Sequence, residues 1–234
     1  MENISIPITI LFLFVVITTV LIFFKAANYS KTVIIILAAY AIIQSILGIS
    51  GFYSNWNAVP PHFLFMVAPA LLTIIVLLIL PGGRKFINGL NIETLTLLHV
   101  IRVPVEITLY YLFIDKLIPQ SMTFEGSNFD ILSGISAPII YYLVFIARKA
   151  NQKILVAWNF ICLGLLLNVV ITALLSAKTP FQKFAFDQPN VGIGYFPFVL
   201  LPALVVPIVL LSHVASLKQL LKRAPNQHRY SVTA

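Results

Sequence analysis

The sequence predicts an all-α, polytopic membrane protein with seven transmembrane helices, its N-terminus outside and its C-terminus in the cytoplasm. Of the 234 residues, 60% are hydrophobic and 9% are charged, and the mean hydropathy is +1.00. A soluble domain has about 25% charged residues, so this chain lacks the polar surface that a water-soluble fold needs. Its apolar residues gather into stretches long enough to span a bilayer, which requires roughly 20 residues of helix.

The first stretch follows Glu2 instead of a basic segment and is long enough to span, so we interpret it as a retained helix and not as a signal peptide. The second contains one strongly polar residue, Gln44, which we expect to hydrogen-bond across helices. The third and seventh resemble each other, the fourth carries charges, and the fifth and sixth follow basic or acidic loops. The expected helices are 6–24, 32–50, 63–80, 94–114, 131–147, 154–177 and 198–221.

Basic residues set the predicted orientation, because Lys and Arg near helix ends stay on the cytoplasmic side. They concentrate in alternate connections and after the last helix, whereas the other connections hold only Lys116, Lys178 and Lys183. Basic residues scattered through short loops do not form a nucleic-acid surface despite the net charge of +8, so we expect the lipid bilayer as partner and no nucleic acid. The basic positions are Lys25, Lys31, Arg84, Lys85, Arg148, Lys149, Lys153, Lys218, Lys222 and Arg223.

The chain is expected to form one transmembrane domain, residues 1–223, followed by a short polar cytoplasmic tail, 224–234, without ordered structure. An internal repeat is also predicted. The sequence FMVAPALLTIIVLL from Phe65 matches FVLLPALVVPIVLL from Phe198 at eight of fourteen positions. Both helices would run inward, as a parallel 3+1+3 duplication requires, although the match does not extend to the other helix pairs.

The fourth helix carries a polar stripe, since His99, Arg102, Glu106 and Tyr110 fall within an arc of about 80°. Charged residues at membrane depth are costly and mark functional sites by default. Arg102 and Glu106 are also spaced i to i+4, so the alternative is a salt bridge that only locks the helix in place. Pro104 between them removes a backbone hydrogen bond and predicts a kink.

The connection after this helix contains Glu125, Asn128 and Asp130, which would lie above Glu106 as an outer vestibule for a cation or a polar ligand. The alternative is that Asp130 caps the fifth helix. Asn168 lies at mid-membrane in the sixth helix, where an amide contributes to a ligand site or bonds across helices.

His99 and His213 fall at matched depth in different helices and could hold a haem or a metal ion, or form a proton relay. The alternative is a pair of histidines that hydrogen-bond across helices. Cys162 is the only cysteine, which excludes an internal disulfide and multi-cysteine metal sites.

From these observations we expect a plasma-membrane protein with a polar internal cavity lined by the third, fourth, sixth and seventh helices. It would bind a small polar or ionic ligand as a transporter or channel-like protein, with Glu106 as the proton- or cation-coupling carboxylate. Two alternatives stay open: an intramembrane enzyme or electron carrier that uses His99 and His213, and a seven-helix sensor or accessory subunit. The sequence does not decide the oligomeric state.

Overall fold

The computed structural model describes residues 5–56, 58 and 61–227, and the chain is 75% helical. Within these residues the only β-type pairing is an isolated bridge between Ala177 and Asn190. The helices are α1 (Ile6–Ala26), α2 (Lys31–Ile49), α3 (Leu64–Ile79), α4 (Pro81–Gly89), α5 (Ile92–Leu98), α6 (Arg102–Ile114), α7 (Ile131–Tyr141), α8 (Gln152–Ser176) and α9 (Val206–Gln227). Short 3₁₀ segments are Phe52–Ser54, His99–Ile101, Gln120–Met122 and Gly192–Gly194, and two π-helical segments are Tyr142–Ile146 and Leu201–Val205.

Every stretch predicted to span the membrane contains a helix, but the number of qualifying spans is smaller than seven. In the described part of the chain, five helices are long and apolar enough to cross a membrane, or up to six if the bent pair α3 and α4 counts as one span. The helix at Ile131–Ile146 is apolar but shorter. α9 extends to Gln227, into the segment expected to be an unstructured tail, and residues 228–234 lie outside the described part.

The bend between α3 and α4 measures 95° and was not predicted. Leu80 precedes a proline, which disfavours helical backbone, and its ψ of 143° ends α3. Pro81 then suits the first position of α4. Arg84 stabilises the corner by donating hydrogen bonds to the α3 carbonyl oxygens of Leu78 (3.2 Å) and Ile79 (3.0 and 2.7 Å).

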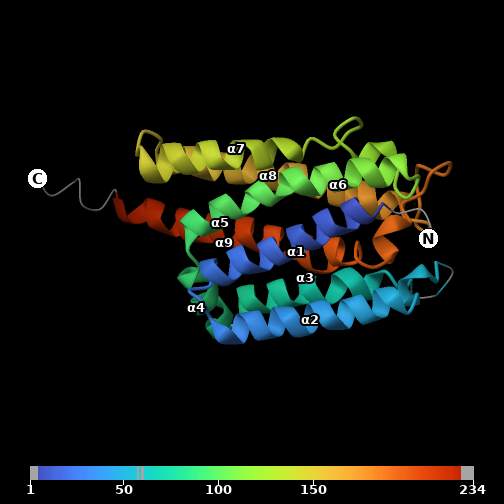
Figure 1. Cartoon of the computed structure of the whole chain (residues 1–234). Coiled ribbons are helices and arrows are strands. Elements are labelled where there is room, and N and C mark those ends of the chain that lie inside the picture. The colour runs from blue at the N-terminus through green and yellow to red at the C-terminus, as the bar shows by residue number, and fades with distance from the viewer. Residues whose placement is uncertain (1–4, 57, 59–60, 228–234) are drawn as a thin grey trace, which may run out of the picture.

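The connections gather at two ends of the bundle (Figure 1). The α1–α2 turn, α4 and the α7–α8 turn lie at one end, and the α2–α3, α6–α7 and α8–α9 connections lie at the other. α1 begins and α9 ends at opposite ends.

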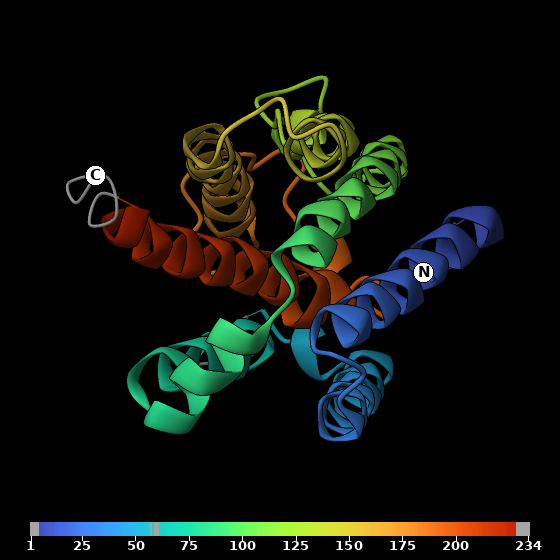
Figure 2. The same ribbon diagram turned by 90° about the vertical axis from the view of Figure 1, so that its left-hand side faces the viewer.

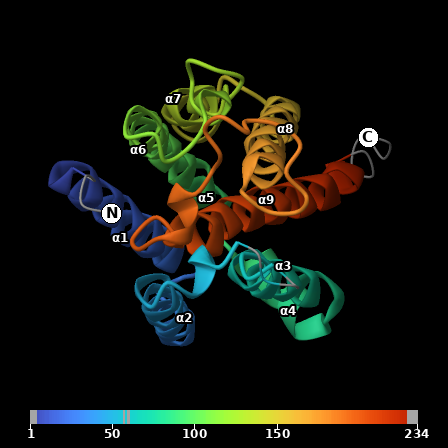
Figure 3. The same ribbon diagram turned by 90° about the vertical axis from the view of Figure 1, so that its right-hand side faces the viewer.

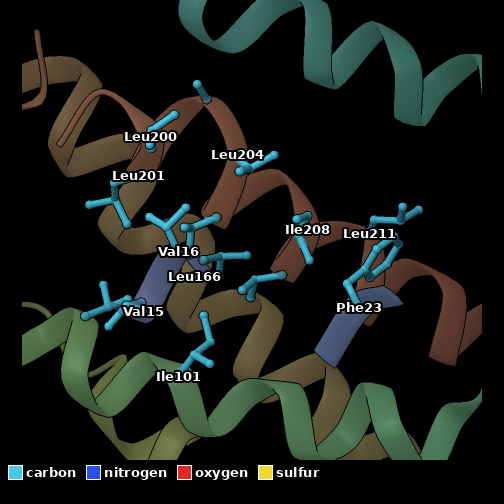
Figure 4. Close-up of a cluster of buried hydrophobic side chains, with 14 of the residues drawn as sticks. Val15, Val16, Phe23, Ile101, Leu166, Leu200, Leu201, Leu204, Ile208 and Leu211 are labelled. Atoms are coloured by element: carbon cyan, nitrogen blue, oxygen red, sulfur yellow. The ribbon is translucent and has the colours of Figure 1, made fainter. Parts of the chain in front are cut away.

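The last helix forms the centre of the molecule. Figures 2 and 3 show α9 crossing the middle of the bundle with the other helices arranged around it. In the span Leu201–Lys222, 72% of the most apolar window is buried, against 11% in α2. Figure 4 shows Leu201, Leu204 and Ile208 packed among side chains of α1, α8 and the α5–α6 span.

This central position distinguishes α9 from α3, its predicted repeat counterpart. Pro69 lies inside a regular α-helix, whereas Pro202 lies in the π-helical turn Leu201–Val205. The sequence similarity of the two segments therefore does not extend to their local structure.

The predicted kink in the fourth span is a local change of helix type. The α-helical pattern gives way to a 3₁₀ turn at His99–Ile101, immediately before Arg102. Pro104 has no N–H to offer the carbonyl oxygen of Val100, so the α-helical ladder cannot continue there. The turn places His99, Arg102 and Glu106 toward the interior, where each is at most 2% exposed.

Gln44 bonds to the chain at the α2–α3 end of the bundle. The hydroxyl of Tyr53 donates a hydrogen bond to the Gln44 side-chain oxygen. Burial raises the pKa of Tyr53 to about 12, so the phenol keeps its proton and remains a donor at neutral pH. Gln44 was expected to bond across helices, whereas this bond is local and joins α2 to the 3₁₀ segment that follows it.

Candidate functional site

The centre of the candidate site is a buried ion pair between α6 and the start of α7. The Arg102 Nε lies 2.6 Å from Asp130 Oδ2, and Nη2 donates to Oδ1 of the same carboxylate. The two side chains are 2% and 6% exposed. This bidentate pair replaces the expected bridge from Arg102 to Glu106, because within the described residues no other acidic side chain lies in ion-pair range of a basic one.

Asp130 was expected in an outer vestibule, with a cap on α7 as the alternative, and it is found instead in the buried ion pair. It occupies the N-cap position, but its side chain makes no capping hydrogen bond. The Asn128 Oδ1 accepts from the Asp130 N–H at 3.0 Å instead, which leaves the carboxylate free to face Arg102. Leaving a buried guanidinium without an opposite charge costs more free energy than leaving a helix without a side-chain cap, so the carboxylate pairs with Arg102.

A glycine lets α7 approach closely enough for this pair to form. A Cβ on Gly134 would lie 2.7 Å from Val103 Cγ2 and 2.8 Å from the Val103 backbone nitrogen. No real Cβ makes such contacts, so a side chain there must push α7 away from Arg102.

We therefore expect Gly134→Ala to lower the free energy of unfolding by about 1–3 kcal/mol, the usual cost of overpacking. Thermal unfolding of the detergent-purified protein measures the effect. Gly164→Ala is the matched control, since nothing lies within 4 Å of its added Cβ. Equal melting temperatures for the two variants would contradict the close approach.

A hydrogen-bonded chain extends from Arg102 to α9 and α8. The Arg102 Nη1 lies 3.1 Å from His213 Nε2, and His213 Nδ1 lies 2.9 Å from Asn159 Oδ1. A guanidinium can only donate hydrogen bonds, so His213 Nε2 must be the acceptor. The proton is therefore on His213 Nδ1, which donates a hydrogen bond to Asn159 Oδ1. The Asn159 Nδ2 then donates to the Leu155 carbonyl oxygen at 2.9 Å. His213 is thereby held as one neutral tautomer.

His99 lies against His213 without sharing a hydrogen bond with it. The two rings stack with centroids 3.9 Å apart and planes 18° from parallel. The rings of Trp158 and His99 pack edge to face, with their centroids 5.5 Å apart. His99 is fully buried, and neither ring nitrogen has a partner within the described residues.

This geometry does not fit the haem or metal site expected for His99 and His213. Stacked rings cannot direct their nitrogens at one ion between them, and both nitrogens of His213 already have partners. The described residues also contain no group of three or more His, Cys, Asp or Glu that could hold a metal ion.

Glu106 pairs with an amide and not with a cation. The Asn128 Nδ2 lies 2.8 and 2.7 Å from the two carboxylate oxygens of Glu106 and 2.9 Å from the Met122 carbonyl oxygen. Glu106 is 1% exposed. One short loop therefore supplies both the amide for Glu106 and the carboxylate for Arg102.

The remaining predicted site residues lie outside this cluster. Tyr110 stacks on Phe124 with ring centroids 5.1 Å apart. Glu125 is exposed at the surface. Asn168 is also exposed, and its amide donates to the Ser127 carbonyl oxygen at 2.8 Å, which fixes the α6–α7 loop. These three residues support or surround the site but do not form it.

A cavity of about 90 Å³ adjoins the cluster. Its walls come from α3, α6, α8 and the last span, the four helices that the sequence predicted, and also from loop residues such as Met122, Asp130 and Ile193. Among the described residues that line it, Glu106 and Asp130 are the only charged ones, and all the others are apolar. Phe63, Ala177 and Ile193 place it toward the α2–α3 end of the bundle. The cavity is thus largely apolar, where a polar one was expected.

Two members of the network were not predicted as site residues. They are Asn159, which orients His213, and Trp158, which donates from Nε1 to Ser136 Oγ at 2.9 Å. The Cys162 backbone oxygen, which accepts from Arg102 at 3.1 Å, carries no sequence signal. The one sequence signal that could have indicated Asn159 is that it lies at the same depth as His99 and His213.

The chain matches one family model, described as "Domain of unknown function (DUF8737)", over residues 59–221. No curated protein matches it. No solved structure matches it either. The matched range includes every residue of the ion pair, the histidine pair and the cavity described above.

Proposed function

We propose that this chain, which belongs to the DUF8737 family of unknown function, is a multi-pass plasma-membrane transporter whose cavity binds a small cationic ligand with an apolar body. The observation that carries the proposal is Glu106. Its carboxylate is buried, faces the cavity and has only an amide as partner.

The charge balance of the site favours a cation. Asp130 is neutralised by Arg102, and Arg102 is further occupied by His213 and the Cys162 carbonyl oxygen. Glu106 is left without a compensating charge. An unpaired carboxylate is costly at membrane depth, so the group takes up a proton or a cation, and alternation between the two is the basis of coupled transport.

The apolar lining indicates the chemistry of the remainder of the ligand. A hydrated metal ion would have to lose its bound water to enter, and the cavity offers few oxygen ligands to replace that water. An organic cation suits the same walls better, because its charge faces Glu106 while its alkyl groups contact apolar side chains.

In this proposal the protein crosses the membrane seven times, with the N-terminus outside. The bent pair α3 and α4 leads from one end of the bundle to the other, and so does the short helix Ile131–Ile146 together with the loop that precedes it. α1 begins and α9 ends at opposite ends, which supports an odd number of crossings. The basic turns gather at the end where α9 finishes, which supports that end as cytoplasmic.

Filling the cavity tests the proposal. Tetramethylammonium is a small apolar cation, neopentyl alcohol is a neutral molecule of similar shape, and pivalate is the matching anion. We expect the cation alone to raise the melting temperature of the purified protein. Ala173→Phe, which places a ring in the cavity, should abolish this shift without lowering the melting temperature of the free protein.

Ile171→Phe is the matched control, since Ile171 lies on the same helix with 54% of its surface exposed. It should retain the full shift. Equal stabilisation by all three probes, or a full shift in Ala173→Phe, would rule out this cavity as the binding site.

A further inference from the structure

A second cavity lies on the opposite side of α9, between α2, α3 and the end of α1. Its volume is about 250 Å³, and its lining includes Phe23, Leu37, Pro69, Leu77 and Leu211. Figure 4 shows Phe23 of α1 beside Leu211 of α9, away from Leu200. It shares no lining residue with the cavity at Glu106, so nothing said of it depends on the proposed function.

The packing of α2 explains why the space exists. Gln44 and Gly48 are the only buried residues of α2, and both lie in its second half. A Cβ on Gly48 would lie 2.8 Å from Val199 Cγ1, so the helix is in close contact with the body there. From Lys31 to Ala41 it has no fully buried residue. Leu37 and Tyr40 are half-buried and line the cavity, and the Tyr40 hydroxyl donates a hydrogen bond to the Met66 carbonyl oxygen of α3 at 3.3 Å. An apolar gap at membrane depth is filled by hydrocarbon in preference to water.

A surface hollow adjoins the end of this apolar cavity. Asn28 and Lys85 are its polar lining side chains, and Ala27, Phe86, Leu90 and two glycines form the rest of its wall. The Ala27 N–H donates to the Phe23 carbonyl oxygen at 2.9 Å, so the hollow begins one helical turn beyond the apolar cavity. A hydrogen bond from Asn28 Nδ2 to the Gly89 carbonyl oxygen, 2.8 Å long, joins the α1–α2 turn to α4 across it.

The close fold of α4 fixes the two hollows next to each other. A Cβ on Gly83 would lie 2.4 Å from Leu77 Cα, so α4 lies directly on the end of α3 that lines the apolar cavity. Gly82, which lines the surface hollow, is next in sequence to Gly83, which contacts Leu77 of the apolar cavity.

The charge at this end of the bundle is strongly positive. Lys85 lines the surface hollow, and Lys25 and Lys31 are exposed on either side of the α1–α2 turn that contributes Ala27 and Asn28 to it. Glu93 is the acidic residue in the first turn of α5. Arg84 is occupied by the α3 carbonyl oxygens. Basic hollows between transmembrane helices at the membrane surface bind anionic lipid headgroups.

We propose that the two hollows form one binding site for an anionic phospholipid. An acyl chain lies in the apolar cavity between α2, α3 and α9, and the phosphate lies at the surface hollow near Lys85 and Lys31. The lipid fills the gap beside the half of α2 that has no fully buried residue.

The test compares short-chain lipids that share acyl chains but differ in headgroup charge. We expect dioctanoyl phosphatidylglycerol to stabilise the detergent-purified full chain at about tenfold lower concentration than dioctanoyl phosphatidylcholine. Lys31→Gln with Lys85→Gln should reduce this preference below about twofold. Ala70→Phe, which fills the apolar cavity, should weaken the effect of both lipids.

Lys149→Gln with Lys153→Gln is the matched control, since these lysines are exposed at the same end of the bundle but outside both hollows. It should keep the full headgroup preference. The proposal is overturned if the control loses the preference equally, if wild type does not distinguish the two lipids, or if glycerol 3-phosphate alone stabilises as well as the lipid. The surface variant keeps the test decisive even if Ala70→Phe fails to fold.

Discussion

Arg102→Met should destabilise the protein by about 3–5 kcal/mol, which is the cost of leaving one member of a buried ion pair without its partner. Asp130 would remain buried with no cation in range, and His213 Nε2 and the Cys162 carbonyl oxygen would lose their donor. Thermal unfolding in detergent, together with the yield of monodisperse protein, measures the loss.

The double variant Arg102→Met with Asp130→Leu separates this explanation from a simple packing defect. Removing both charges eliminates the desolvation cost of each, so we expect the double variant to recover at least half of the lost stability. Lys116→Met is the surface control and should change stability by less than about 0.5 kcal/mol, because Lys116 is exposed. If the double variant is as unstable as the single one, the ion pair does not account for the loss.

Glu106→Gln should leave the fold intact and remove ligand binding. The amide keeps one oxygen that can accept from Asn128 Nδ2, so the loop that holds Asp130 stays in place. The charge that attracts the cation is gone, and losing one partner of a buried charge pair costs about 2–5 kcal/mol of binding, or about 30-fold or more. Binding isotherms for tetramethylammonium give the ratio directly.

Glu125→Gln removes the same charge from the exposed loop above the site and serves as the control. We expect its affinity for tetramethylammonium to stay within about twofold of wild type, since exposed charges are screened by salt and solvent. If Glu125→Gln weakened binding as much as Glu106→Gln, the attraction would come from the acidic surface and not from the cavity.

The helices followed from hydropathy with small errors at their ends, and the differences have local causes. The sequence analysis interpreted the residues after Leu80 as a basic loop. The backbone turns at Leu80 and Pro81, and these residues form a separate helix, α4. The segment at 131–147 was at the short limit for a span, and the structure places a helix there that is too short to qualify. Neither hydropathy nor charge reports how far a helix tilts or bends, so the number of crossings could not be fixed from composition.

The candidate site was found from one helix but was paired incorrectly. A helical wheel correctly identified His99, Arg102 and Glu106 as one inward face, because angular position depends on sequence alone. It could not identify Asp130 as the partner of Arg102, since that contact depends on the approach of α7 at Gly134. The stacking of His99 on His213 follows from the central position of α9, which hydropathy does not reveal.

The measurement that tests the central claim most directly is uptake by the purified protein reconstituted into liposomes. Radiolabelled tetramethylammonium is followed into vesicles that contain wild type, Glu106→Gln or Glu125→Gln at equal protein density. The account predicts saturable uptake by wild type and Glu125→Gln, and uptake by Glu106→Gln no faster than by empty vesicles. Uptake at the wild-type rate by Glu106→Gln would contradict it.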